Sequence, residues 1–132
     1  MKKTIIFLTF LLGLAIVLSG CSNNKTNKEK MQGTWSADNS AAKRFIDGTG
    51  MKIKDDQIKI INPESDVAKS VLLNNFNFKD DEQKNIRFYT EPKDDEYFDK
   101  DSPDEEGIIH FEDNDTMVIE EELDEPYKFK RE

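Results

Sequence analysis

The chain of 132 residues contains one cysteine, one histidine and one tryptophan. A single cysteine excludes an intrachain disulfide and a thiolate metal centre, and one histidine leaves few partners for the usual nucleophilic catalytic pairs. Basic residues are scarce as well, because 19 Lys and Arg stand against 28 Asp and Glu, a formal net charge of −9. Such a surface repels nucleic acid, so the composition argues against nucleic-acid and phosphate binding.

The only long apolar run lies at the N-terminus, in MKKTIIFLTFLLGLAIVLSG. Lys2 and Lys3 give it a positive start, and residues 4–18 are apolar apart from threonine and glycine. Charge, apolar core and small-residue exit in this order are typical of a secretory signal peptide. The run is shorter than the roughly 20 residues that a membrane-spanning helix needs.

This segment ends in Leu18, Ser19, Gly20 and Cys21. The sequence Leu-Ser-Gly-Cys resembles the lipobox of bacterial lipoproteins. The resemblance implies that residues 1–20 are removed as a signal peptide and that diacylglycerol on Cys21 anchors the mature chain to the extracytoplasmic face of the cell membrane. Two or more acyl chains hold a protein on a bilayer where one does so only marginally. A retained membrane anchor and an ordinary secreted protein are the alternatives.

Downstream of Cys21 the composition predicts a tether and one domain. Residues 22–30, SNNKTNKEK, contain no apolar side chain, so residues 21–30 are predicted to be a flexible tether. Residues 31–132 are enough for one modest core. Without Lys2 and Lys3 the mature chain has 17 basic against 28 acidic residues, a formal −11. Its field would attract a cationic peptide or a divalent ion, or it serves solubility alone.

Within residues 31–132 apolar side chains recur mostly at every second position, which is typical of half-buried strands. Strands are expected on both sides of Asp55-Asp56, and Asp113–Asp115 is expected to form a tight hairpin. The predicted fold is mainly β, an antiparallel meander. The residues predicted to form most of its core are Trp35, Leu72, Phe76, Phe78, Ile86, Phe88, Ile109, Phe111, Met117, Ile119, Tyr127 and Phe129.

One segment, ADNSAAKRFI at residues 37–46, predicts a short helix. Asp38 or Ser40 is expected to cap it, and Gly48 and Gly50 follow its end. A loop that crosses one end of the sheet is the alternative.

Gly33 and Trp35 open the predicted domain, and Arg131 lies in its last strand. This arrangement resembles the lipocalin-like (calycin) pattern of small β-barrels. The resemblance implies a barrel in which the Trp35 indole covers the closed end and Arg131 packs over it. Lys130 is a poorer match because it falls on the opposite face of its strand. The domain is shorter than a full lipocalin, so a barrel filled by its own side chains and one with a ligand cavity both stay open, as does another β-sheet with Trp35 as an ordinary core residue.

The sequence predicts no enzyme, no catalytic residue and no cofactor. His110 falls on the strand face opposite Ile109 and Phe111, where a surface role is the ordinary one. The acidic segment at residues 94–107, DDEYFDKDSPDEEG, has oxygen ligands that calcium would accept. It lacks the spacing of an EF-hand, so a solvated loop is the default interpretation and no metal site is predicted.

Three functions remain as hypotheses. The first is a lipid-anchored cell-envelope lipoprotein whose acidic lipocalin-like domain has a binding or structural role. The second is sequestration of a cationic peptide, because size, anchor and charge resemble those of immunity lipoproteins from lantibiotic producers. The third, and least supported, is an enzyme that acts on an envelope polymer.

Overall fold

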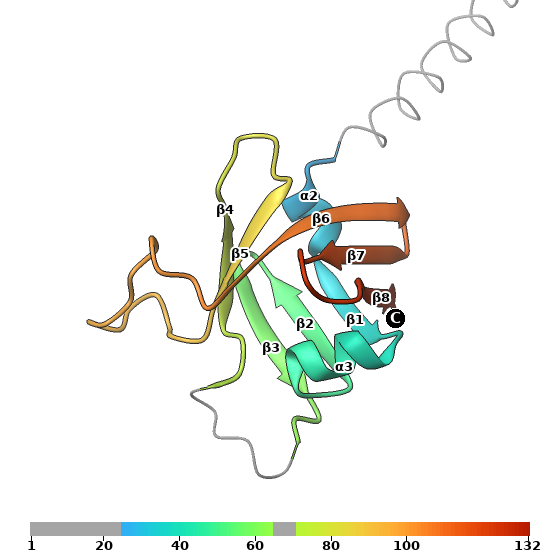
Figure 1. Cartoon of the computed structure of the whole chain (residues 1–132), viewed down its shortest axis with the longest axis horizontal. Coiled ribbons are helices and arrows are strands. Elements are labelled where there is room, and N and C mark those ends of the chain that lie inside the picture. The colour runs from blue at the N-terminus through green and yellow to red at the C-terminus, as the bar shows by residue number, and fades with distance from the viewer. Residues whose placement is uncertain (1–24, 65–70) are drawn as a thin grey trace, which may run out of the picture.

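The computed structural model describes residues 25–64 and 71–132, in which eight antiparallel strands form a closed barrel (Figure 1). Each strand pairs with the next in sequence, and the first pairs with the last. The predicted fold class, an antiparallel meander that closes into a small barrel, is confirmed. The strands are β1 (Gly33–Ala37), β2 (Gly50–Lys54), β3 (Gln57–Ile61), β4 (Asn75–Phe78), β5 (Asn85–Tyr89), β6 (Glu105–Asp113), β7 (Thr116–Glu120) and β8 (Tyr127–Arg131).

Short turns set the register of the barrel. Asp55 takes a left-handed conformation (φ 56°) in the β2–β3 turn, and the Asp113 carboxylate accepts a hydrogen bond from the Asp115 amide (2.8 Å) in the predicted β6–β7 hairpin. The shortest junction is that of β3 with β4, through the single pair Gln57↔Asn75. Acidic and amide residues at these turns tolerate left-handed backbone and bond their own loops, so the meander follows from local sequence.

In the part of the chain that the structure describes, two short helices accompany the barrel, α2 (Asn27–Met31) and α3 (Ser40–Ile46). The predicted caps of α3 are wrong: Asn39 is its N-cap, and its side chain accepts a hydrogen bond from the Ala42 amide (2.8 Å). α2 lies mostly within the segment predicted as a tether, so regular structure begins four residues before the predicted domain start at Met31. Within the described ranges no helix is long and apolar enough to cross a membrane.

Large side chains fill the centre of the barrel. Trp35, Phe88 and Phe129 are fully buried, and Phe76 is 1% exposed. Most of the predicted core is confirmed, but Leu72, Phe78 and Phe111 are only partly buried, and Leu73 is buried instead of Leu72. The predicted alternation fails there because β4 begins only at Asn75. Tyr89 and Val118 are buried outside this core. Further core residues that the sequence prediction left out are Met31, Ala41, Ala42, Ile46, Met51, Ile53, Ile58, Ile60 and Leu73.

The segment between β5 and β6 folds over the outer wall of the barrel. The Tyr89 ring lies 4.9 Å from that of Phe98, and its hydroxyl donates to the Lys100 carbonyl. Tyr89 points away from the barrel interior, yet is only 2% exposed because this segment covers it. Part of the acidic segment is therefore packed against the wall and is not a free loop.

Candidate functional site

The residues of the lipocalin-like pattern meet at the α2 end of the barrel. Trp35 pairs with Arg131 across the β1–β8 junction, and the Arg131 guanidinium lies 4.3 Å from the centroid of the Trp35 ring. The indole N–H donates to the Met31 carbonyl (2.8 Å). Arg131 also donates to the carbonyls of Gln32 and Lys30 (2.7 Å each). The predicted contact of Arg131 with the Trp35 ring is confirmed. The hydrogen bonds from these two side chains to the carbonyls of residues 30–32 hold α2 against the barrel.

Gly33 has a steric role at this junction. Its φ of +120° is a conformation that side chains rarely adopt, and a Cβ there would lie 3.1 Å from a guanidinium nitrogen of Arg131. Glycine is therefore the residue that lets the strand begin beside the arginine. Gly33, Trp35 and Arg131 thus contact one another and the chain at residues 30–32, so their observed role is structural.

Leu18, Ser19, Gly20 and Cys21 lie outside the described residues. His110 is exposed on β6, opposite Val118 of β7. Among the residues that the structure describes, no three or more histidine, cysteine, aspartate or glutamate side chains form a group that could hold a metal ion.

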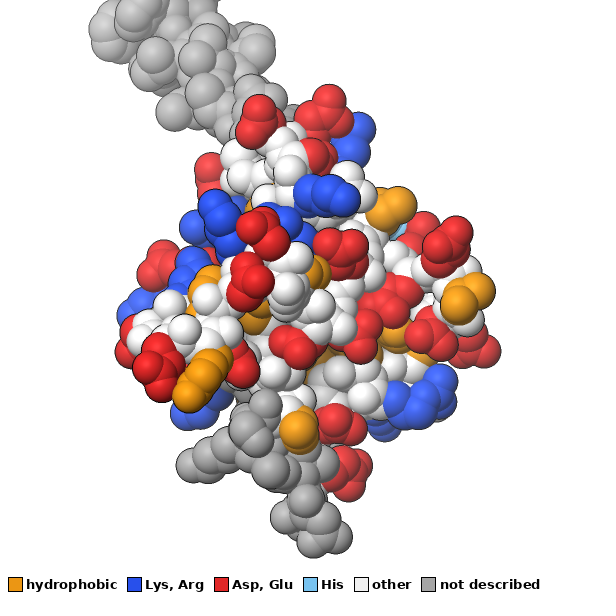
Figure 2. Space-filling model, turned by 60° about the vertical axis from the view of Figure 1, so that its left-hand side comes forward, with side chains coloured by type: hydrophobic (Ala, Val, Ile, Leu, Met, Phe, Trp, Pro, Cys, Tyr) orange, Lys and Arg blue, Asp and Glu red, His pale blue; other side chains and the backbone are white. Residues whose placement is uncertain are grey.

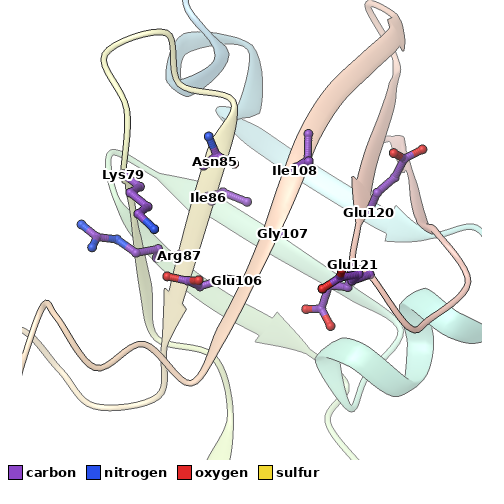
Figure 3. A pocket seen from close by; sticks show the side chains of 10 residues that line it. Lys79, Asn85, Ile86, Arg87, Glu106, Gly107, Ile108, Glu120 and Glu121 are labelled. Atoms are coloured by element: carbon purple, nitrogen blue, oxygen red, sulfur yellow. The ribbon is translucent and has the colours of Figure 1, made fainter.

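A groove of about 440 Å³ runs over β5, β6 and the end of β7 (Figure 3). We call it the acidic groove. Lys79 and Arg87 lie on one side of it and Glu120 and Glu121 on the other, with the exposed Ile108 between them. Its lining residues are Lys79, Asn85, Ile86, Arg87, Glu106, Gly107, Ile108, Glu120, Glu121 and Glu122.

Glu121 is the residue of this groove whose environment is least favourable for a charge. Burial and the nearby charge of Glu105 raise its pKa to about 7, although the hydrogen bond from Tyr127 acts in the other direction. Glu121 Oε2 accepts from the Tyr127 hydroxyl (3.1 Å), whereas its Oε1 is buried and has no hydrogen-bond partner among the described residues. When Glu121 is ionised, its buried Oε1 carries negative charge that no donor among the described residues compensates.

Tyr127 joins Glu121 to the turn after β7. Its hydroxyl also lies 3.0 Å from the Asp124 carboxylate, and its ring stacks on Phe45 of α3 at 4.4 Å. Burial and these two acceptors raise the Tyr127 pKa, so the hydroxyl keeps its proton and remains a donor. One proton cannot satisfy two carboxylates fully. Glu121 and Asp124 therefore share one hydroxyl donor.

Sequence reasoning missed the acidic groove, although a signal for it was present. The hairpin at Asn114-Asp115 brings the acidic start of β6 beside the acidic end of β7, and a register shift between Phe111 and Asp113 places Ile108 opposite Glu120. The sequence prediction instead treated residues 94–106 as one acidic loop. The groove also requires the pairing of Ile108 with Asn85 on β5. The register of this pair could not be predicted from the sequence, because a long segment separates β5 from β6.

Comparisons of the chain with protein-family models, with curated proteins and with solved structures find no match. The lipobox and the Gly33, Trp35 and Arg131 pattern stay resemblances. The geometry provides a groove with four glutamates, two basic residues, an exposed apolar side chain and one carboxylate oxygen that has no donor among the described residues. These features suit a ligand with positively charged donors and an apolar side.

Proposed function

We propose that the protein is a lipid-anchored cell-envelope lipoprotein whose small lipocalin-like barrel binds a cationic peptide in the acidic groove. The lipobox, Leu18 to Cys21, supports the anchor. The pattern of Gly33, Trp35 and Arg131 supports the relation to lipocalin-like barrels. The observation that carries the binding proposal is Glu121, a half-buried carboxylate beside other carboxylates with one oxygen lacking a donor.

The anchor and the groove are compatible in this proposal. α2 begins six residues after Cys21, and six residues of extended chain span at most about 20 Å. The α2 end of the barrel would then stay close to the bilayer. The acidic groove lies on the side wall, over β5 to β7, and remains open to a peptide from outside.

The filled barrel favours a ligand on the outer wall over one in the interior. Trp35, Phe76, Phe88 and Phe129 occupy the centre, where a lipocalin with a cavity would hold its ligand. The barrel therefore acts as a scaffold that fixes the positions of the outward side chains.

A peptide fits the groove better than a bare ion. An ammonium or guanidinium group would pair with the exposed Glu106, Glu120 and Glu122 and would reduce the repulsion among them. Ile108, 51% exposed, offers apolar contact to a neighbouring side chain of the same peptide. Because a bound cation favours the ionised form of Glu121, binding strengthens as the pH rises through about 7.

The binding test is calorimetric titration of the full chain in nonionic detergent with an amphipathic lysine–leucine peptide at low and high salt. We expect Glu106→Gln, Glu120→Gln and Glu122→Gln together to weaken binding at least about tenfold, since the affinity depends on charge complementarity in the groove. The matched control changes Glu64, Glu96 and Glu112 to glutamine, which are exposed and lie outside the groove. Equal losses in both triple variants would mean that net charge alone attracts the peptide.

The anchor has a separate test. Cys21→Ser should either release the domain from the membrane fraction or leave an uncleaved precursor, because serine cannot carry the thioether-linked diacylglycerol. Fractionation and mass spectrometry of the variant measure both. A serine variant that stays with membranes at its mature mass contradicts the lipobox interpretation.

The proposal includes no reaction. His110 lies exposed on the outer wall and outside the acidic groove. The remaining hypothesis, an enzyme that acts on an envelope polymer, is tested by incubating the protein with cell-wall fragments and searching for released products. If the protein releases products from the fragments and Glu121→Gln abolishes that release, the protein is an enzyme and the binding proposal is wrong.

A further inference from the structure

A second hollow, of about 570 Å³, lies on the barrel wall over β2, β3 and the start of β4. We call it the lysine hollow. Residues 92–94, which follow β5, form its rim, and Asn74 and Asn75 lie on its β4 side. Its basic residues are Lys52, Lys54, Lys59 and Lys93.

The three strand lysines share one surface because of strand alternation. Lys52 and Lys54 are exposed and alternate with the buried Met51 and Ile53 of β2, and Lys59 is exposed on β3. Lys52 lies directly opposite Lys59 in the β2–β3 ladder. Like charges in this position repel and destabilise the pair. Within residues 25–64 and 71–132, neither these two lysines nor Lys54 has a carboxylate partner within ion-pair distance.

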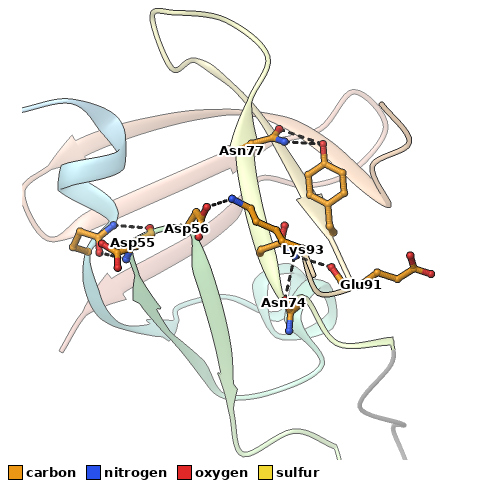
Figure 4. A network of polar contacts seen from close by, with 9 residues as sticks. Asp55, Asp56, Asn74, Asn77, Glu91 and Lys93 are labelled. Carbon is orange, nitrogen blue, oxygen red and sulfur yellow. Dashed lines mark hydrogen bonds and ion pairs between the residues drawn. The ribbon is translucent and has the colours of Figure 1, made fainter. Parts of the chain in front are cut away.

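The rim of the hollow is held in place by specific contacts (Figure 4). Lys93 forms an ion pair with Asp56 of the β2–β3 turn. Asn75 is 1% exposed, and its amide nitrogen donates to the Glu91 carbonyl (2.7 Å) and to the Asn74 side chain (3.1 Å). These contacts fasten the chain at residues 91–93 to β3 and β4, so the fourth lysine is positioned beside the other three.

Asn75 gives a second, independent sign that the hollow is incomplete. Its side-chain oxygen is buried and has no hydrogen-bond partner among the described residues. Buried acceptors are nearly always paired with a protein donor, an ordered water or a ligand. Among the residues that the structure describes, an acceptor without a donor and three lysines without an anion therefore occur on the wall of the same hollow.

We propose that the lysine hollow binds a phosphate group, carried either by a free phosphate ester or by the headgroup of an anionic lipid. Lysine ammonium groups act as compact point charges that donate from any direction. Three exposed lysines on two neighbouring strands, with Lys93 at the rim already paired with Asp56, suit the tetrahedral oxygens of a phosphate better than a planar carboxylate. A hydroxyl or bound water beside the phosphate supplies the donor that Asn75 lacks. The formal net charge of −9 argued against such a site, but four lysines line this hollow together with a single acidic residue, Asp94.

The experiment follows amide resonances of the ¹⁵N-labelled full chain in nonionic micelles. One arm adds inorganic phosphate or glycerol phosphate. The other arm adds phosphatidylglycerol to the micelles, with uncharged diacylglycerol as its control. We expect saturable shifts at Lys52, Lys59, Asn75 and Lys93 and none in the acidic groove. A response in the first arm identifies a free ester, and a response in the second arm alone identifies a lipid headgroup; either supports the site.

Matched variants decide whether the lysines bind the phosphate. Lys52→Gln with Lys59→Gln should raise the dissociation constant at least about tenfold, because two charge-assisted hydrogen bonds are lost. Lys25→Gln with Lys43→Gln removes the same charge from exposed positions outside the hollow and should change the constant less than about twofold. All four positions are exposed, so folding is not at risk. No shift in either arm, or equal loss in both double variants, overturns the proposal.

Discussion

The acidic groove and the lysine hollow lie on the wall of one barrel and have opposite charge. Four glutamates line the groove over β5 to β7, and four lysines line the hollow over β2 to β4. Figure 2 shows acidic side chains over much of one face, with basic ones gathered in a few places. Alternate residues of a strand share a face, so like charges at every second position add up locally. The net charge of −9 describes neither region.

The two regions also differ in how far water reaches their charges. In the groove, Glu121 is half-buried and one of its oxygens is shielded from solvent. In the hollow, Lys52, Lys54 and Lys59 are exposed, and Asp56 already neutralises Lys93. Repulsion is stronger where solvent screens it less. We therefore expect substitutions in the groove to change stability more than those in the hollow.

The largest expected effect removes the scaffold that both regions share. Phe88 is fully buried and packs edge-to-face on Phe45 at 5.2 Å. Phe88→Ala should lower the free energy of unfolding by about 3–5 kcal/mol, the usual cost of truncating a buried aromatic residue. Chemical denaturation followed by Trp35 fluorescence measures the change.

The exposed Tyr97 serves as the control for this experiment. It is 75% exposed, so Tyr97→Ala should change the free energy of unfolding by less than about 0.5 kcal/mol. If Phe88→Ala is as stable as Tyr97→Ala, the barrel register is wrong, and the groove and the hollow lose their common frame.

Much of the fold could be predicted because the pattern within each strand is local. Alternation identified the burial of Ile86, Phe88, Met117 and Ile119, all of which are fully buried. The prediction failed where a residue depends on distant chain segments. Asn39 caps α3 while its amide nitrogen also reaches the Pro126 carbonyl.

The site was harder to predict than the fold. The meeting of Trp35 with Arg131 could be predicted, because barrel closure brings the first and last strands together. The lysine hollow depends on Lys93, whose position is set by Asp56 and Asn75 far away in sequence. No local pattern contains that information.

The second prediction concerns the end of the barrel that belongs to neither charged region. A double-mutant cycle of Trp35→Phe with Arg131→Met should show coupling of about 0.5–2 kcal/mol, the range of a cation–π contact. Each single change also loses other bonds, such as those from Arg131 to Gln32 and Lys30, but the cycle subtracts them. Additive effects within about 0.3 kcal/mol would leave the indole and the guanidinium energetically independent.

The third prediction tests how far burial and the charge of Glu105 destabilise the ionised form of Glu121. The pKa of Glu121 is raised from 4.5 to about 7, so between these values the folded protein holds more protons than the unfolded chain. The free energy of unfolding therefore falls as the pH rises from about 4.5 to 7. Glu121→Gln should remove this loss and stabilise the protein at pH 8 by about 1 kcal/mol, a value reduced for solvent screening. Thermal unfolding at pH 5 and pH 8 measures both states.

Glu112→Gln is the control for this pH dependence, because Glu112 is exposed and lies outside the groove. Its unfolding should keep the slope of the unaltered protein between pH 5 and pH 8. If Glu121→Gln also keeps the pH dependence of the unaltered protein, ionising Glu121 does not destabilise the fold. The groove would then be as exposed to water as the hollow.

The smallest expected effect tests the hollow in the same terms. Lys52 and Lys59 are directly opposite each other on β2 and β3, and removing either charge ends their repulsion, so Lys52→Gln and Lys59→Gln should each be slightly stabilising. Once one charge is removed, the second substitution should not stabilise the protein further. The double-mutant cycle should therefore show a coupling of about 0.2–0.5 kcal/mol, with the sign opposite to that of Trp35 and Arg131 because the lysines repel each other. Saturating phosphate should reverse the order of stability, because the unaltered pair binds the anion and the double variant does not. Thermal unfolding with and without phosphate measures both. A cycle that is additive without phosphate, together with no reversal in its presence, would mean that water alone solvates these lysines and that only the groove stores charge repulsion.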